Sequence, residues 1–296
     1  MSSTEEDTGE APRTPEDREV SSAVATHYAV PDLGDRILAA LQAAGKDTTC
    51  LAPQDLAPID EFHVRGREAT LELAQTVGLQ STDYALDVGS GIGGTARCLA
   101  QEFGCRVTGV DLTAEYCRVA AMLAARTGLT DRVDYRQADA NDLPFPDGAF
   151  SVVWTEHVAM NIPDKQRFYR EMHRVLTPGG RLAIYDVLAG PSGPVHFPVP
   201  WARTSATSFL VSPEQLRDLL AKAGFTLVQW SDRTAAARAW LTELGKRLRE
   251  EGPPVLGFHL LLGPEFETMA RNQKLSLEEG RMVLAQVVAR KKTSPP

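Results

Sequence analysis

The 296-residue sequence has no apolar run near the roughly 18 residues that a membrane-spanning helix needs. The Met, Ser, Thr, Glu and Asp at its start also lack the features of a secretory signal. Positive charge is in the minority, because 31 Lys and Arg face 39 Asp and Glu. Sequence-independent nucleic-acid binding needs a basic surface, so this acidic balance argues against it. We therefore expect a cytoplasmic protein without membrane or nucleic-acid partners, either an enzyme or a small-molecule binder.

Paired cysteines are also missing. The four cysteines, Cys50, Cys98, Cys105 and Cys117, form no C-x-x-C pair. Neither a zinc site nor a dithiol redox motif is therefore indicated, and we expect no metal. Reduced and mostly buried thiols are the simplest interpretation.

Large apolar residues are scarce in the first 20 residues, which hold seven acidic and two basic side chains. Such a segment cannot bury enough apolar surface to offset its ordering entropy, so we predict a disordered acidic tail over residues 1–20. Residues 21–296 then form one domain. Its predicted parts are N-terminal helices over 21–79, a core over 80–188, a lid over 189–211 and a C-terminal part of the sheet over 212–296.

Apolar strand-like runs alternate with helical segments through the core. The predicted strands are Tyr84–Val88, Arg106–Val110, Val133–Gln137, Phe150–Trp154 and Arg181–Leu188, followed by Phe225–Trp230 and Arg281–Arg290. Helices of ten or more residues between strands indicate β-α-β units. We therefore predict an α/β fold with a doubly wound, mostly parallel, seven-stranded sheet. Residues 46–61 are predicted to be a loop.

A glycine-rich turn follows the first of these strands. Residues 87–94 read D-V-G-S-G-I-G-G, and glycines at a strand-to-helix turn let the backbone approach a ligand closely. Asp111 stands 20 residues after Gly91, where a carboxylate can accept ribose hydroxyls. These residues alone are compatible with either NAD or S-adenosylmethionine.

Asp87 helps to separate the two cofactors, because an anion beside the turn would repel a pyrophosphate and attract a sulfonium or an ammonium group. Two further motifs follow in order, A-D-A-N-D-L-P-F at residues 138–145 and L-T-P-G-G at 176–180. With G-V-D-L-T at 109–113, the set resembles the class I S-adenosylmethionine-dependent methyltransferases over residues 60–190.

This resemblance implies roles for individual residues. Asp87, Gly89, Ser90 and Gly91 would hold the methionine part, and Asp111 the ribose. Leu112 would pack on the adenine, whose edge Asp139 and the Ala140 backbone would contact. Thr155 would close the site near the methionine amino group, and His63 would approach the cofactor carboxylate.

The segment after the fourth strand, residues 154–165, is the predicted source of catalytic groups. With residues 61–70 it resembles the sarcosine/dimethylglycine and phosphoethanolamine N-methyltransferases, and also the tocopherol and quinone C-methyltransferases. The phosphoethanolamine enzymes pair a His with an N-terminal Tyr, and here that dyad would be Tyr28 with Asn161. His157 is then the only titratable base of suitable pKa.

Other residues are predicted to contact the acceptor. Arg65 and Arg67 could bind an anionic group, and the lid candidates are His196, Trp201, Arg203 and Phe209. The first predicted acceptor is a small amine of the sarcosine type, and the alternative is C- or O-methylation of a phenolic or quinone-like metabolite. An NAD-dependent oxidoreductase and a catalytically silent binding module are the alternatives from other classes. The sequence leaves the oligomeric state open.

Overall fold

Seven strands form one sheet in the computed structural model, which describes residues 15–252 and 254–292. The strand order is β3-β2-β1-β4-β5-β7-β6, and only β7 runs antiparallel to its neighbours. The predicted doubly wound, mostly parallel sheet is confirmed. The strands are β1 (Tyr84–Val88), β2 (Arg106–Asp111), β3 (Val133–Gln137), β4 (Phe150–Glu156), β5 (Leu176–Ala189), β6 (Phe225–Asp232) and β7 (Met282–Lys291).

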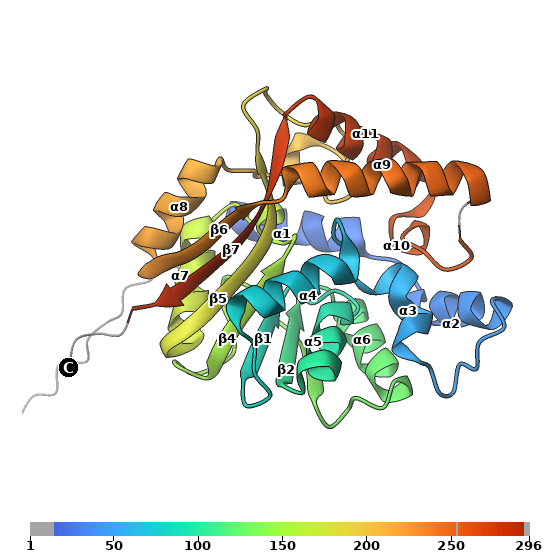
Figure 1. Cartoon of the computed structure of the whole chain (residues 1–296), viewed down its shortest axis with the longest axis horizontal. Coiled ribbons are helices and arrows are strands. Elements are labelled where there is room, and N and C mark those ends of the chain that lie inside the picture. Colours follow the sequence, from blue (N-terminus) through green and yellow to red (C-terminus); the bar gives the residue numbers. More distant parts are fainter. Residues whose placement is uncertain (1–14, 253, 293–296) are drawn as a thin grey trace, which may run out of the picture.

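Helices cover both faces of the sheet (Figure 1). On one face lie α4 (Gly66–Val77), α5 (Gly94–Phe103) and α6 (Ala114–Arg126), and on the other α7 (Lys165–Val175) and α8 (Pro213–Lys222). Side chains alternate along each strand, so Ala85 packs in the first of these layers and Leu86 in the second. Both residues are fully buried, as expected of a parallel sheet covered on two sides.

The N-terminal part differs from the sequence prediction in two places. Helix α1 (Pro15–Tyr28) begins inside the predicted acidic tail, which is therefore wrong for residues 15–20, while residues 1–14 lie outside the described chain. Val20, Val24 and Tyr28 recur every fourth residue on its partly buried side, which gives the helix an apolar face to pack. Helix α2 (Leu33–Ala43) follows.

The predicted loop at residues 46–61 contains a helix, α3 (Pro53–Asp60). Pro53 stands at its first position, where the missing N–H costs nothing, and the Ala52 backbone N–H donates to Asp55 Oδ2 at 2.9 Å. Buried Leu56 and Ile59 face the core. Two apolar residues in an eight-residue stretch are too few for the periodicity to reveal the helix.

Two segments lie above the carboxyl ends of the parallel strands (Figure 1). One is residues 190–211, which contain the short turn Ser205–Thr207. The other is inserted between β6 and β7 and comprises α9 (Thr234–Glu251), α10 (His259–Leu262) and α11 (Phe266–Glu278). No helix of the described ranges is long and apolar enough to cross a membrane.

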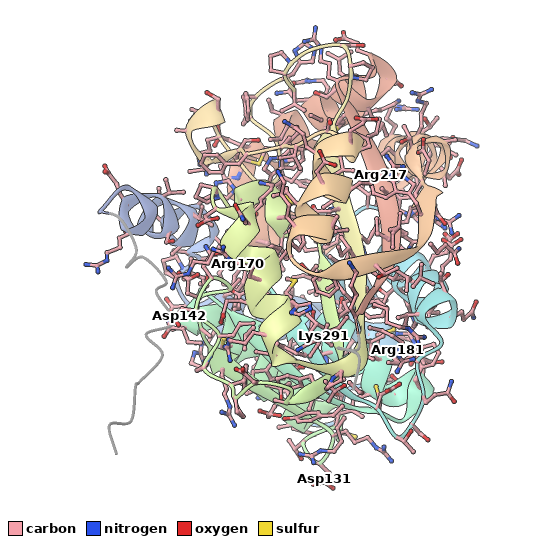
Figure 2. The ribbon with its side chains drawn as sticks, turned by 90° about the vertical axis from the view of Figure 1, so that its left-hand side faces the viewer. Asp131, Asp142, Arg170, Arg181, Arg217 and Lys291 are labelled. Atoms are coloured by element: carbon pink, nitrogen blue, oxygen red, sulfur yellow. The ribbon has the colours of Figure 1, made fainter. Side chains whose placement is uncertain are left out.

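Polar side chains surround the ribbon on the face seen in Figure 2, where Arg170 and Arg217 mark α7 and α8. The guanidinium of Arg217 lies 3.9 Å from the centre of the Trp230 ring and so covers an aromatic side chain of β6. Lys291 Nζ donates to the Leu176 carbonyl at 2.7 Å and ties the end of β7 to the start of β5. The described residues hold no cluster of three or more metal-ligating side chains.

Gly94, the first residue of α5, lies against the backbone of α3. A Cβ atom added there would come within 1.8 Å of the Asp60 carbonyl oxygen. We therefore expect Gly94→Ala to lower the free energy of unfolding by about 1–3 kcal/mol, because rigid backbone must move to admit the methyl group. Urea unfolding measures the change. Gly245→Ala is the control, because Gly245 also lies in a helix without a positive φ, and a Cβ there would meet only the end of the Arg249 side chain at 3.5 Å. An equal loss in both variants would show that the contact with Asp60 is not the cause.

Candidate active site

Two adjoining cavities lie at the carboxyl ends of β1, β2, β3 and β4, where the strand order reverses between β1 and β4. Ligands in open α/β sheets bind at such a switch point. The larger cavity has roughly twice the volume of the smaller. Both are lined by Tyr28, Phe62, His63 and His157.

The larger cavity, called the acidic cavity below, brings most of the predicted residues together. Its lining includes Tyr28, His63, Asp87, Gly89, Ser90, Gly91, Asp111, Leu112, Asp139, Ala140, His157 and Asn161, together with the unpredicted Phe62, Tyr116 and Glu156. No Lys or Arg is among the described residues that line it. Five carboxylates line it, from Asp60, Asp87, Asp111, Asp139 and Glu156, and this excess of negative charge favours a positively charged ligand.

The glycine turn forms one wall of this cavity. The backbone N–H groups of Gly89 and Ser90 both donate to the Val110 carbonyl, at 2.8 and 2.9 Å, and Gly91 donates to Asp111 Oδ2 at 2.9 Å. Gly91 has φ +53° and open space beside it, so a ligand can approach its backbone. Gly89 has φ +77°, and a Cβ there would lie 2.3 Å from Val158. The tight turn therefore depends on glycine at both positions.

Buried polar atoms in this wall lack partners among the described residues. They are Asp87 Oδ2, Ser90 Oγ and Glu156 Oε1. Burial, together with the charges of Glu156 and Asp111, raises the pKa of Asp87 well above its usual range. A ligand carrying an ammonium and a sulfonium group would satisfy these oxygens and neutralise the carboxylates, so the residues present fit S-adenosylmethionine.

Asp111 stands at the end of β2. Its Oδ1 accepts the Thr113 backbone N–H at 2.8 Å, and its Oδ2 accepts that of Gly91. Burial raises the pKa of Asp111, while these hydrogen bonds act against the rise. Each carboxylate oxygen has a second lone pair, which leaves both able to accept a hydroxyl of a ribose.

Glu156 is the main cavity residue that the sequence prediction missed. The strand β4 extends two residues beyond the predicted end at Trp154, and the alternation of side chains turns Glu156 into the acidic cavity. Thr155 was predicted there instead. That prediction is corrected, because Thr155 is fully buried and lines neither cavity.

His63 and Glu156 form a buried ion pair between the two cavities. His63 Nε2 lies 3.3 Å from Glu156 Oε2, which also accepts the hydroxyls of Thr70 and Thr95 at 3.1 Å each. Burial opposes a charge on His63, but the Glu156 carboxylate overcomes it and raises the pKa of His63 to about 9. His63 therefore carries a proton at neutral pH, already paired with a carboxylate.

His157 has an unusual backbone and an unpaired ring. Its φ is +53°, in the left-handed region that non-glycine residues rarely adopt outside functional sites. Its ring centre lies 5.0 Å from that of Tyr185 and 5.7 Å from that of His63, and its buried Nε2 has no partner among the described residues. Burial, helped by the positive charge of His63, lowers the pKa of His157 well below 6.5. The imidazole is therefore neutral and can accept a proton.

The structure also brings the predicted pair Tyr28 and Asn161 together. The Tyr28 hydroxyl donates to Asn161 Oδ1 at 3.0 Å. Asn161 Nδ2 in turn donates to the carbonyls of Trp201 and Thr207, both at 2.8 Å. Asn161 thus connects α1 to residues 190–211 across the acidic cavity.

The smaller cavity, called the apolar chamber below, differs sharply in character. Besides the four shared residues, its lining is Val64, Met160, Pro200, Trp201, Trp240, Leu241, Leu244, Phe258, Phe266, Ala270 and Gln273. Much of this wall comes from the insertion between β6 and β7. The part of these helices in the site was not predicted, because their apolar faces look like ordinary core faces.

Of the four predicted lid residues, one lines a cavity and three do not. Trp201 is buried and lines the apolar chamber. Three predictions are corrected, because His196, Arg203 and Phe209 line neither cavity. His196 pairs with Glu279 at 2.8 Å and Arg203 with Glu265, both at the surface. Phe209 contributes backbone only, donating its N–H to the Met160 carbonyl at 2.7 Å.

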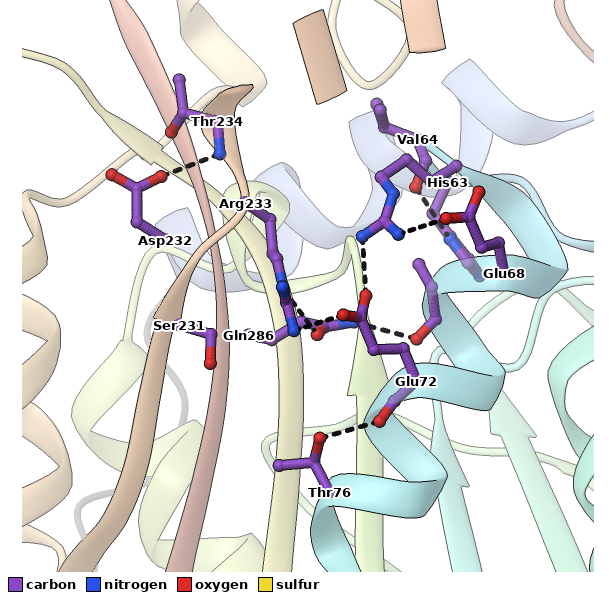
Figure 3. A network of polar contacts seen from close by, with 12 residues as sticks. His63, Val64, Glu68, Glu72, Thr76, Ser231, Asp232, Arg233, Thr234 and Gln286 are labelled. Atoms are coloured by element: carbon purple, nitrogen blue, oxygen red, sulfur yellow. Dashed lines mark hydrogen bonds and ion pairs between the residues drawn. The ribbon is translucent and has the colours of Figure 1, made fainter. Parts of the chain in front are cut away.

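Arg65 is also corrected as an acceptor-binding residue. Its guanidinium donates to Glu68 at 2.7 Å and to Glu72 at 2.8 Å, in a polar network beside α4 in which Figure 3 labels both glutamates. Glu72 also pairs with Arg233, which donates to Gln286 on β7 at 3.0 Å. Arg233 thus ties α4 to the sheet, whereas both partners of Arg65 belong to α4 itself. Arg67 pairs with Glu102 at 2.7 Å, away from both cavities.

Comparison with known proteins agrees with this geometry. Residues 86–184 match the family model described as a methyltransferase domain. Methyltransferase GfsG of Streptomyces halstedii is 32% identical over 212 residues, which cover 70% of this chain and 72% of that protein. The 27-O-demethylrifamycin SV methyltransferase of Amycolatopsis mediterranei is 38% identical over 123 residues, covering 42% of this chain and 45% of that protein.

Solved structures share the fold. The [4+2]-cyclase SpnF superposes with a TM-score of 0.66 and 25% identity, covering 93% of this chain and 97% of that one. Phosphoethanolamine N-methyltransferase 2 of Haemonchus contortus, solved with S-adenosylmethionine, gives a TM-score of 0.69 and 22% identity, over 79% of this chain and 54% of that one. The acidic cavity and the similarity to methyltransferases exclude the alternative of an NAD-dependent oxidoreductase. The chain belongs to the S-adenosylmethionine-dependent methyltransferases, enzymes that act on small molecules.

Proposed function

We propose that this enzyme methylates a hydroxyl oxygen of a largely apolar small molecule and that His157 is the general base. One observation carries the proposal. His157 lines both cavities, and it combines a neutral imidazole with a ring nitrogen that lacks a partner. A hydroxyl presented from the apolar chamber would meet this base beside the acidic cavity.

The chamber lining supports an apolar acceptor. Trp201, Trp240, Phe258 and Phe266 surround it, and no Lys or Arg is among its described lining residues. A sarcosine-like amine carries a carboxylate, which would need a cationic partner there. Among the described lining residues His63 is the only positively charged side chain, and it is paired with Glu156. The small amine predicted first from the sequence therefore receives less support than the alternative acceptor.

The change of charge during the reaction suits a buried base. When bound, S-adenosylmethionine supplies a methyl group activated by a sulfonium, whose positive charge is lost on transfer. His157 takes the hydroxyl proton as the new C–O bond forms, so positive charge appears on the imidazole while it disappears from the sulfur. The protein thus keeps the same net charge in its site, which lessens the penalty of charging a buried imidazole.

Tyr28 and Asn161 support this arrangement without titrating. Burial, with the charges of Asp111 and Asp186, raises the pKa of Tyr28 above its usual range, so its hydroxyl stays protonated and donates to Asn161. The hydrogen bond holds α1 over both cavities, because Tyr28 lines each of them. We assign this pair to positioning and to the exclusion of water.

The rifamycin relative supports an oxygen acceptor, since its name describes methylation at an oxygen. It matches less than half of either chain, so the acceptor of this protein must be found directly. The test is transfer of a ¹³C-labelled methyl group from S-adenosylmethionine to two panels of compounds. One panel holds apolar phenols and alcohols, and the other holds sarcosine, dimethylglycine and phosphoethanolamine.

We expect the label in the organic extract, with the carbon chemical shift of a methyl ether. A product with the chemical shift of a methyl group on carbon would show that the enzyme methylates carbon instead of oxygen. C-methylation is the other reaction in the alternative predicted from the sequence. Label confined to the water-soluble amines would contradict the proposal and return the function to the small amine.

A further inference from the structure

Gln273 is a polar side chain in the wall of the apolar chamber. It lies on α11 with Phe266 and Ala270, and the spacings of four and three residues put all three on one face of the helix. The other two members of this face are apolar. Gln273 is therefore the polar residue on an otherwise apolar helix face that lines the chamber.

The Gln273 side chain is mostly buried in this wall, and its amide has no partner among the described residues. The residue is 7% exposed, and its side chain makes no hydrogen bond with any residue in 15–252 or 254–292. Its neighbour Asn272, by contrast, donates to the Pro198 carbonyl at 3.0 Å. An amide that opens onto the chamber without a protein partner can pair with a complementary group of a ligand.

Three other polar side chains of the chamber already have roles. The Tyr28 hydroxyl donates to Asn161, His63 is paired with Glu156, and His157 is the proposed base. We infer that Gln273 recognises a second oxygen of the acceptor, a carbonyl or hydroxyl group set apart from the hydroxyl that is methylated. This inference rests on the proposed function and makes Gln273 a specificity-determining residue.

An amide suits this role, because its NH₂ donates to a carbonyl and its oxygen accepts from a hydroxyl. The acceptor class is thereby narrowed to an apolar body that carries at least two oxygens. A site that binds an oxygen in this way discriminates strongly against an analogue that lacks it, because the amide is then left unpaired.

The test uses pairs of 4-alkylphenols that differ by one keto or hydroxyl group on the alkyl chain. Methyl transfer to both members is compared in the full-length wild type and in Gln273→Met, which keeps the side-chain length and removes the amide. We expect the wild type to prefer the oxygenated member of at least one pair by about tenfold or more in kcat/KM. Gln273→Met should bring that ratio close to one, mainly by raising KM for the oxygenated phenol.

Gln75→Met is the matched control, since Gln75 is an exposed glutamine on α4 outside both cavities. Thermal unfolding without ligand is the second readout, and Gln273→Met should be as stable as the wild type or more so. If Gln273→Met still prefers the oxygenated phenol, the inference about Gln273 is wrong but the proposed function stands. A clear loss of stability in this variant would also overturn the inference, because it would show a structural role. A wild type that methylates no phenol contradicts the proposed function, and Gln273 then loses its assigned ligand.

Discussion

His157→Asn should lower the turnover of methyl transfer by about 10²–10⁴-fold, the range usual for the loss of a general base. Asn is the informative replacement, because it tolerates the left-handed backbone at this position better than most residues. The affinity for S-adenosylhomocysteine should hardly change, since the cofactor contacts implied by the resemblance lie on other residues. Single-turnover kinetics and calorimetric titration measure the two quantities separately.

The pH profile gives the same variant a second test. His157 must be neutral to accept a proton, and its pKa lies well below 6.5 because of burial and the charge of His63. Activity should therefore remain constant as pH falls through 6.5 and decline only well below it. In His157→Asn this acidic decline should be absent. A turnover equal to that of the wild type would remove His157 from the mechanism.

Asp111→Ala should weaken binding of S-adenosylhomocysteine by about 100-fold or more. The carboxylate is expected to accept two ribose hydroxyls, and each hydrogen bond to a charged group contributes about 1.5–3 kcal/mol. Asp111→Asn keeps one acceptor oxygen in the same shape and should lose less. Equilibrium titration of the apo protein measures all three affinities.

The control for Asp111 is Asp131→Ala, an exposed carboxylate at the opposite end of the molecule (Figure 2). Because Asp111 also accepts the Gly91 and Thr113 backbone N–H groups, unfolding of the ligand-free variants must be measured alongside. A folded Asp111→Ala protein that binds S-adenosylhomocysteine as tightly as the wild type would exclude the ribose role.

Local chemistry explains why the acidic cavity could be predicted from sequence. The glycine turn, Asp87 and Asp111 each follow directly from a strand end, and a parallel sheet gathers such ends at one edge. Glu156 was not predicted as a cavity residue, because the predicted strand ended two residues too early. An error of that size is small for a strand boundary, yet it left Glu156 outside the strand, so the alternation that turns this side chain into the cavity was not applied to it.

The apolar chamber could not be predicted in the same way. Its walls combine Trp201, Trp240 and Phe266, which are far apart in sequence and carry no motif. The aromatic side chains of residues 189–211 led to the prediction of a lid there. In the structure, however, Arg203 and His196 form ion pairs with carboxylates at the surface. Which charged residue pairs with which depends on tertiary contacts that spacing along the chain does not reveal.

The antiparallel pairing of β6 with β7 has a consequence for how the chamber is encoded. Asp232, at the end of β6, is paired with Ala285 near the start of β7, so the stretch carrying α9, α10 and α11 leaves and re-enters the sheet at neighbouring positions. Topologically it is an enlarged hairpin loop. Much of the chamber wall therefore comes from one continuous stretch of sequence between β6 and β7. The glycine turn and its carboxylates belong to strands on the other side of β5.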